Sequence, residues 1–242
     1  MRMPCFPLHV VLFPHLPLPL HIFEERYRAM TRAVLADDSP YAGRFAICAI
    51  TAGAEVGDDG NPPTTGRIGT IAEVRSAEQF ADGRWALLVV GTERVALGAV
   101  DRSGPFAIVE VEPLPESTGD ATVAGRLLPQ VQTALDGYLV AVKRVVASAS
   151  AVSREPKAAT EVAASLDDLL KPIHLPADAL AASYAVAGVL QIELQRKQQL
   201  LELPDGASRL QAELSLLRRE TRLLADGAMS PLRRDDLGYN PN

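Results

Sequence analysis

The hydrophobic pattern of this chain changes its period near residue 118, and the change restricts what each part can fold into. Before it, short runs of β-branched and aromatic residues lie between turn residues, a pattern that is typical of strands. After it, apolar residues recur every three or four positions, which indicates amphipathic helices. The sequence therefore predicts a β-rich domain over residues 1–117, a helical domain over 118–226 and a disordered polar tail over 227–242.

The β-rich part is expected to bend into a small barrel. Its predicted strands cover residues 5–13, 45–50, 66–74, 84–97 and 106–112. Asp82-Gly83 predicts a hairpin, and the wholly apolar run 85–90 predicts a strand that is buried on both faces. Gly91 ends this run, and a glycine inside a strand pattern marks a bulge or bend of the kind that closes small barrels. One helix, over residues 24–35, is inserted after the first strand.

The helical part is predicted to contain a small bundle of helices. Helical periodicity covers residues 118–145, 156–170, 176–201 and 210–224. The last helix carries a near-heptad of leucines that extends over only about two heptads, too short to indicate a coiled coil. Packing against the preceding helix is the favoured interpretation, and a homodimer through these C-terminal helices is the alternative.

The N-terminal segment needs separate treatment because Arg2 precedes an apolar run that resembles a secretory signal. The hydrophobic part of a signal forms a short helix ahead of a small-residue cleavage site. Prolines interrupt this run and prevent such a helix; they are Pro4, Pro7, Pro14, Pro17 and Pro19. No other stretch reaches the roughly 18 uninterrupted apolar residues that a membrane-spanning helix needs. We therefore expect a cytoplasmic protein with no membrane partner.

The charge balance argues against a nucleic-acid partner. The chain has 24 Lys and Arg against 30 Asp and Glu, which gives a formal net charge of -6. A nucleic-acid binder neutralises several phosphates with clustered basic residues, whereas the basic residues here are dispersed among carboxylates. The sequence predicts that this protein binds no nucleic acid.

Metal binding is not expected either. Two cysteines, Cys5 and Cys48, cannot supply a four-ligand zinc site. His9, His15 and His21 are evenly spaced in a proline-rich segment, which differs from the paired ligand patterns of zinc sites. The cysteines are interpreted as buried free thiols, with a single disulfide as the alternative.

The motifs of common enzyme classes are missing from the sequence. No phosphate-binding G-x-x-x-x-G-K-S/T loop, no G-x-G-x-x-G after a strand, no G-x-S-x-G elbow and no H-E-x-x-H helix occurs. Spacing alone leaves a Ser–Lys dyad open, but none of the lysines has a flanking signature. We expect no catalytic residue, no cofactor and no enzymatic activity.

One segment resembles a known family. Residues 6–30 contain a series of short motifs, namely Pro7-Leu8, Phe13-Pro14, Leu18-Pro19-Leu20, Ile22-Phe23-Glu24 and Arg26-Tyr27. Their order is similar to the opening of the N-terminal domain of Lon protease. The resemblance continues more loosely through the later strands, including Val90 to Val95, and through the helices, so it covers nearly the whole chain.

The resemblance implies an α+β fold, in which a PUA-like β pseudobarrel with one inserted helix precedes a helical bundle. The full protease continues into an ATPase module and a Ser-Lys peptidase domain, and this chain carries the motifs of neither. The resemblance therefore implies a stand-alone bacterial protein that recognises proteins or peptides without hydrolysing them. Expected partners are unfolded or tagged polypeptides, or a protease or chaperone.

The candidate binding residues lie in the proline-rich segment. An exposed apolar patch usually marks a binding surface, and we expect such a patch from five residues, namely Phe13, Pro14, Leu16, Pro17 and Leu18. The alternative is that these side chains plug one end of the barrel.

Charged and aromatic residues of the family motif allow two interpretations. Phe23, Glu24, Tyr27 and Gly91 are expected to be structural. Arg26 and Arg94 are interpreted first as members of a structural ion-pair network. They could instead line a small-molecule pocket between the two domains, since ligand sites favour domain interfaces, and a small-molecule-binding regulatory protein is the alternative function. RNA binding ranks third, because fold alone does not fix function and the net charge opposes it.

Overall fold

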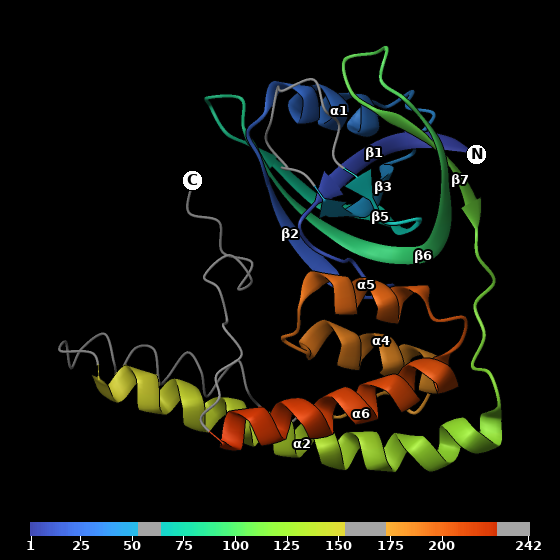
Figure 1. Cartoon of the computed structure of the whole chain (residues 1–242). Coiled ribbons are helices and arrows are strands. Elements are labelled where there is room, and N and C mark those ends of the chain that lie inside the picture. The colour runs from blue at the N-terminus through green and yellow to red at the C-terminus, as the bar shows by residue number, and fades with distance from the viewer. Residues whose placement is uncertain (53–63, 153–172, 227–242) are drawn as a thin grey trace. The chain divides into compact units, whose positions relative to one another are not determined.

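The computed structural model describes residues 1–52, 64–152 and 173–226 (Figure 1). They form two compact units. The first consists of Met1–Ser117 and Ile192–Pro204, and the second consists of the described residues within Thr118–Gln191 and Asp205–Asn242. The helix predicted over residues 156–170 and the tail predicted over 227–242 lie outside the described residues.

The strands of the first unit form a closed ring. In chain order they are β1 (Arg2–Leu8), β2 (Pro17–Ile22), β3 (Arg44–Ala52), β4 (Thr64–Thr65), β5 (Ile68–Gln79), β6 (Trp85–Asp101) and β7 (Ile108–Pro113). Neighbouring strands follow the order β1-β7-β6-β5-β3, and parallel pairing of β1 with β3 closes the ring. The predicted small barrel is confirmed, and it is visible as the curved strands of Figure 1.

Strand β6 is long and bends at Gly91, so its two halves pair with different strands of the barrel. Its first half pairs with β2 and its second half with β7, while β5 runs along its other edge. The β5–β6 register shifts next to Gly91. A Cβ atom at this position would lie 2.3 Å from the carbonyl oxygen of Phe13, so only glycine permits this approach. The predicted bend at Gly91 is confirmed.

Helix α1 (Glu25–Leu35) covers part of the barrel core, as the pattern over residues 24–35 predicted. Its Tyr27, Met30 and Val34 are buried in one apolar cluster with Phe6 and Phe45. Burying such a side chain contributes about 1.5–3 kcal/mol. The ring of Phe6 lies 4.2 Å from that of Tyr27, centroid to centroid, which fixes the helix on β1.

The single helix predicted over residues 176–201 is wrong. The structure has α4 (Ala179–Val189) and α5 (Leu194–Glu202), with extended backbone at Leu190 and Glu193 between them. The two helices bury their apolar residues in different cores: α4 belongs to the second unit, whereas α5 belongs to the first and packs on β3 and β5. No proline or glycine occurs between residues 189 and 194, and Gly188 lies inside α4, so the helical periodicity continued across the break.

The second unit is built from α2 (Ala121–Val152), α4 and α6 (Gly206–Ala225). Carboxylates cap each of these helices at its first turn; they belong to Asp120, Asp178 and Asp205. Leucines of α6 are buried against α2 and α4, so packing within the chain accounts for the near-heptad and nothing in it supports a dimer. None of the helices in the described ranges combines the length and hydropathy needed to cross a bilayer.

Candidate functional site

Strand β2 is an edge strand whose side chains alternate between the barrel core and solvent. Leu18, Leu20 and Ile22 face the apolar core, whereas the alternate positions 17, 19 and 21 are exposed. The sequence did not predict this strand, because prolines occupy two of its six positions. On an edge strand, a proline whose missing N–H faces away from the neighbour costs no ladder hydrogen bond.

Pairing with β6 places further apolar groups beside the exposed prolines. Pro19 lies opposite Leu88, and Pro17 lies opposite Val90. Leu88 is 39% exposed, although the apolar run 85–90 predicted a strand buried on both faces. The inward-facing Leu87 and Val89 are buried, so this strand alternates in the same way as β2.

The turn between β5 and β6 extends this surface with an aromatic ring. Phe80 is 38% exposed, and its ring centroid lies 5.9 Å from that of His21 on β2. We define the outer strip as the exposed residues of β2, of β6 and of this turn that lie next to one another, namely Pro17, Pro19, His21, Phe80 and Leu88.

The turn that carries Phe80 is held in one conformation. The N–H of Gly83 donates to the carbonyl of Phe80 at 2.9 Å, and Gly83 has a φ of 83°, which favours glycine. The backbone N–H and the guanidinium of Arg84 both donate to the carboxylate of Asp82, and these bonds lower the pKa of Asp82. The hairpin predicted from Asp82-Gly83 is confirmed, and it presents Phe80 from a fixed position.

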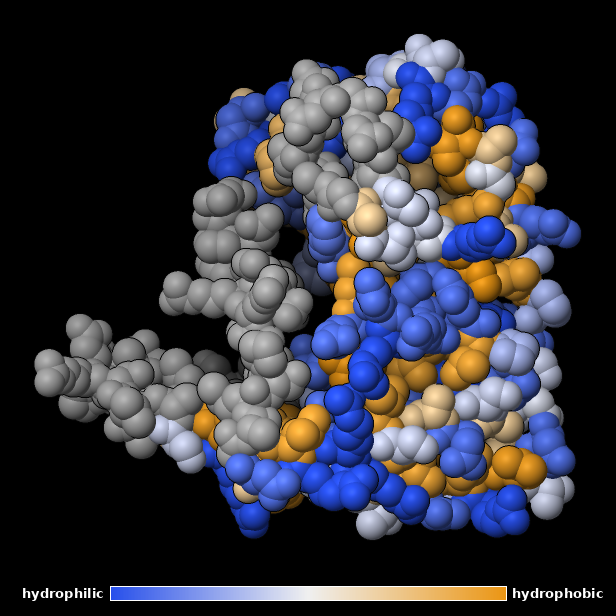
Figure 2. Space-filling view, in the orientation of Figure 1, coloured by the Kyte–Doolittle hydropathy of each residue, from blue (hydrophilic) through white to orange (hydrophobic). Residues whose placement is uncertain are grey.

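The outer strip suits recognition by side chains better than strand addition. An incoming strand needs backbone donors and acceptors along the free edge, and Pro17 and Pro19 supply no donor. Exposed apolar groups beside charged ones such as Glu78 and Arg84 form an apolar surface with a polar rim instead. On the face shown in Figure 2, hydrophobic residues gather in several small patches separated by hydrophilic ones.

The prediction that Phe13 and Pro14 are exposed is wrong. Phe13 is 1% exposed, and Pro14 is buried in a bridge with Gly91. The hydroxyl of Thr70 also donates to the carbonyl of Leu12 at 2.6 Å, which ties this segment to β5. The barrel-plug alternative therefore applies to Phe13 and Pro14.

The remaining three predicted patch residues differ in exposure. Pro17 is exposed and belongs to the outer strip, whereas Leu16 and Leu18 are half-buried. Leu18 packs against the core cluster. Binding by Leu16, Pro17 and Leu18 stays a prediction.

The side chain of Arg94 is buried among acceptors from the protein itself. Its side chain is 2% exposed, and its Nε lies 3.0 Å from a carboxylate oxygen of Glu116. Its two terminal nitrogens donate to four backbone carbonyls on two separate segments; these carbonyls belong to Pro115, Leu201, Leu203 and Pro204. Protein acceptors therefore surround the guanidinium, and the structural interpretation is favoured over ligand binding.

Arg26 has local partners of a different kind. It pairs with Glu24 at 2.8 Å, and its guanidinium lies 4.6 Å from the ring centroid of Tyr27. These contacts involve residues next to α1, whereas Arg94 contacts the segments around residues 115 and 203. The small-molecule pocket predicted to be lined by both arginines is therefore not favoured.

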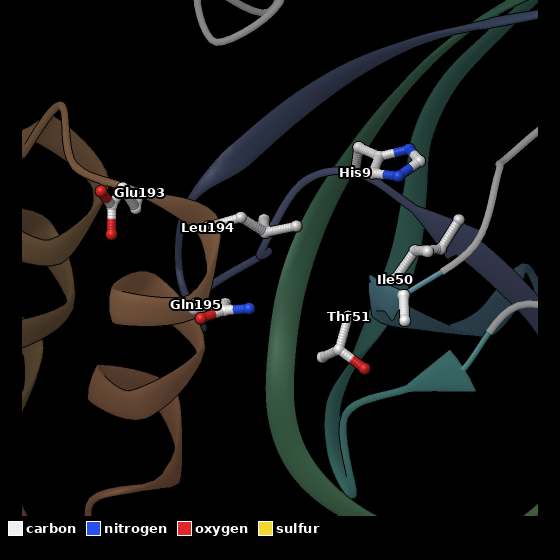
Figure 3. A pocket seen from close by; sticks show the side chains of 7 residues that line it. His9, Ile50, Thr51, Glu193, Leu194 and Gln195 are labelled. Carbon is white, nitrogen blue, oxygen red and sulfur yellow. The ribbon is translucent and has the colours of Figure 1, made fainter. Parts of the chain in front are cut away.

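A separate hollow opens beside the end of β3 and the start of α5 (Figure 3). It encloses about 410 Å³ and is lined by His9, Ile50, Thr51, Ala52, Glu193, Leu194 and Gln195. The charged and amide side chains among its described lining residues are exposed, so they are not the buried polar groups that orient a small ligand. Within the described residues, no group of three or more His, Cys, Asp or Glu side chains could hold a metal ion.

The matching family model and the curated relatives all refer to Lon protease. The family described as the ATP-dependent protease La (LON) substrate-binding domain matches residues 2–219. Lon protease 1 of Myxococcus xanthus is 27% identical over 225 residues, covering 93% of this chain and 25% of the relative. Lon protease of Escherichia coli K12 is 24% identical over 224 residues, covering 92% and 25%. The chain thus spans about a quarter of the length of these curated relatives.

Solved structures with a similar fold carry related names. The N-terminal domain of Mycobacterium avium complex Lon protease superposes with a TM-score of 0.59 at 20% identity, covering 90% of this chain and 98% of that one. A Lon N-terminal domain protein from Xanthomonas campestris gives a TM-score of 0.54 at 22% identity, covering 89% and 98%. At these identities the likeness establishes the fold.

Proposed function

Since the chain belongs to the family of LON substrate-binding domains, we propose that it recognises apolar segments of unfolded polypeptides through the outer strip. The observation that carries this proposal is the row of exposed apolar side chains on a closed barrel. Leu88 and Phe80 are each more than a third exposed, and both come from paired strands or from a turn held by hydrogen bonds. A surface held in this way loses little conformational freedom when a segment binds.

The size of the outer strip sets the expected strength of binding. Removing about 200 Å² of apolar surface from water contributes roughly 5 kcal/mol, and association costs offset part of this gain. We therefore expect dissociation constants weaker than about 0.1 mM for a single segment. Weak binding of this kind suits the transient capture of many different sequences, since apolar contacts do not depend on one particular pattern of hydrogen bonds.

In this proposal, binding and processing of the polypeptide are carried out by different proteins. The relatives named above are Lon proteases, of which this chain covers about a quarter, and the family that it matches is described as a substrate-binding domain. We infer that the chain holds a segment and that an ATP-dependent protease or a chaperone processes it. No step of this scheme requires a catalytic residue in the described part of the chain.

The test measures binding of a fluorescently labelled polypeptide that is reduced and carboxymethylated so that it cannot refold. Leu88→Asp places a charge in the centre of the outer strip, and we expect it to weaken binding at least about tenfold. Val140→Asp is the matched control, because Val140 is 49% exposed but lies on α2, in the second unit. Equal losses in both variants, or no binding by the unmodified protein, would contradict the proposal.

A further inference from the structure

The two cysteines of the chain meet inside the barrel. Cys5 lies on β1 and Cys48 on β3, and their sulfur atoms are 3.1 Å apart. Both side chains are buried and both are free thiols. Strands β1 and β3 are the pair whose parallel contact closes the barrel ring, so the thiols lie across its closing seam.

The register explains how residues so far apart in sequence come into contact. Cys5 lies opposite Ala46, and Cys48 lies opposite Pro7. The two cysteines therefore occupy diagonal positions on the same face of neighbouring strands, and their side chains lean toward each other. They share one apolar cluster with Met3, Ala46, Ile71, Val95, Val109 and Val111. Apart from the thioether of Met3, these neighbours bring no metal ligand. The thiol partner of each cysteine is the other cysteine, and the side chain of Thr65 also hydrogen-bonds to Cys48.

We propose that Cys5 and Cys48 form a reversible dithiol–disulfide site, which a peroxide or a low-molecular-weight disulfide oxidises. With hydrogen peroxide, the Cys5 thiolate attacks one oxygen, breaks the O–O bond and becomes a sulfenic acid as hydroxide leaves. The sulfur of Cys48 then attacks the sulfenic sulfur, and its proton leaves with the hydroxyl group as water. The proton that Cys5 released on ionising joins the hydroxide to form a second water molecule, so two thiols and one peroxide give one disulfide and two water molecules.

The electrostatics of the pair select the attacking sulfur. The hydrogen bond between the sulfur atoms lowers the pKa of Cys5, and the nearby guanidinium of Arg102 acts in the same direction, whereas burial opposes both. The same hydrogen bond, together with burial, raises the pKa of Cys48. Cys5 therefore ionises first, and the thiolate is the reactive form of cysteine. Because both sulfur atoms are buried, we expect the reaction to proceed through local opening of β1.

The consequence of oxidation is a covalent link across the seam. A disulfide between residues 5 and 48 would restrict separation of β1 from β3, which otherwise depends on hydrogen bonds and packing. Oxidation is therefore expected to slow opening of the barrel, and reduction is expected to restore it.

The test equilibrates the unmodified chain with mixtures of reduced and oxidised glutathione and measures the disulfide fraction by thiol alkylation and mass spectrometry. We expect loss of two hydrogen atoms per chain, a peptide map that joins residues 5 and 48, and full reversal by dithiothreitol. If the fold brings the thiols together for this reaction, the equilibrium constant for oxidation should exceed that of the urea-unfolded chain by at least about tenfold.

An equal or smaller constant in the folded chain would overturn the proposal, as would accumulation of glutathione adducts or of disulfides between chains. The variants Cys5→Ser and Cys48→Ser serve as controls. Each should stop at a single glutathione adduct, whereas the unmodified chain should proceed to the internal disulfide. The main comparison uses the unmodified chain, so it stays decisive even if a variant fails to fold.

Discussion

At the scale of single residues, the least expected feature is a carboxyl group buried in the helical unit. Glu213 on α6 has no exposed surface, and neither of its carboxyl oxygens has a hydrogen-bond partner among the residues that the structure describes. Burial raises the pKa of Glu213 well above its usual value, and the guanidinium of Arg209 on the same helix opposes this shift only in part. Arg209 itself donates to the hydroxyl of Ser183 and stacks on Tyr184.

A raised pKa in the folded state means that the folded chain binds the Glu213 proton more tightly than the unfolded chain does. The free energy of unfolding should therefore fall as the pH rises above about 4.3, the pKa of glutamate in the unfolded chain. The fall should end once the pH exceeds the raised pKa of Glu213 in the folded chain. Glu213→Gln mimics the protonated form, so it should match wild type at pH 4 and exceed its stability by about 1–2 kcal/mol at pH 8. Urea unfolding at both values checks this, and parallel pH profiles would contradict it.

Arg94 offers a second test at this scale. Arg94→Met removes the hydrogen bonds that Arg94 donates to the Glu116 carboxylate and to four backbone carbonyls, and we expect a loss of about 3–5 kcal/mol. Arg94→Lys keeps the charge but lacks the fork of donors, so its loss should be smaller. Arg84→Met, at an exposed arginine, should change stability by less than about 0.5 kcal/mol. A similarly small effect of Arg94→Met would refute its structural role.

At the scale of elements, the bend in β6 depends on one glycine. Gly91→Ala would place a Cβ atom 2.3 Å from a backbone oxygen, and backbone cannot move aside cheaply, so we expect a loss of about 2–4 kcal/mol. Gly125→Ala is the matched control, because it sits inside α2 and, apart from its chain neighbours and the backbone of its own helix, no atom of the described residues lies within 4 Å of its added Cβ. The control should stabilise the chain by about 0.5–1 kcal/mol. Thermal unfolding that ranked the two variants in the opposite order would contradict this account of the bend.

The sequence predicted those elements whose conformation is determined by residues within the element itself. Gly91 and Asp82-Gly83 are examples, because a bend and a turn depend on backbone conformations that glycine adopts readily. Strand β2 was missed because its prolines argue against a strand unless its position at an edge is known. The break between α4 and α5 was missed because it arises from burial in two different cores, which local periodicity does not record.

The candidate site was predictable only in part for a related reason. The proline-rich segment contributes Pro17 and Pro19 to the outer strip, but Phe13 and Leu18 turn inward while Pro17 turns outward. Which side faces the core depends on pairing with β6 and on the path of the chain past Gly91. The contribution of Leu88 could not be predicted from a wholly apolar run, since such a run does not distinguish the inner face of a strand from the outer one.

At the scale of the whole molecule, the chain has a closed barrel and a helical unit, and the family match covers residues 2–219. Its central claim is that the outer strip of the barrel contacts unfolded polypeptide. The most direct measurement is photo-crosslinking of an unfolded polypeptide that carries a diazirine on an apolar side chain, followed by peptide mapping. We predict crosslinks concentrated on residues 17–21 and 80–88. Crosslinks that instead concentrate beside His9 and Gln195, or on the helical unit, would contradict the claim.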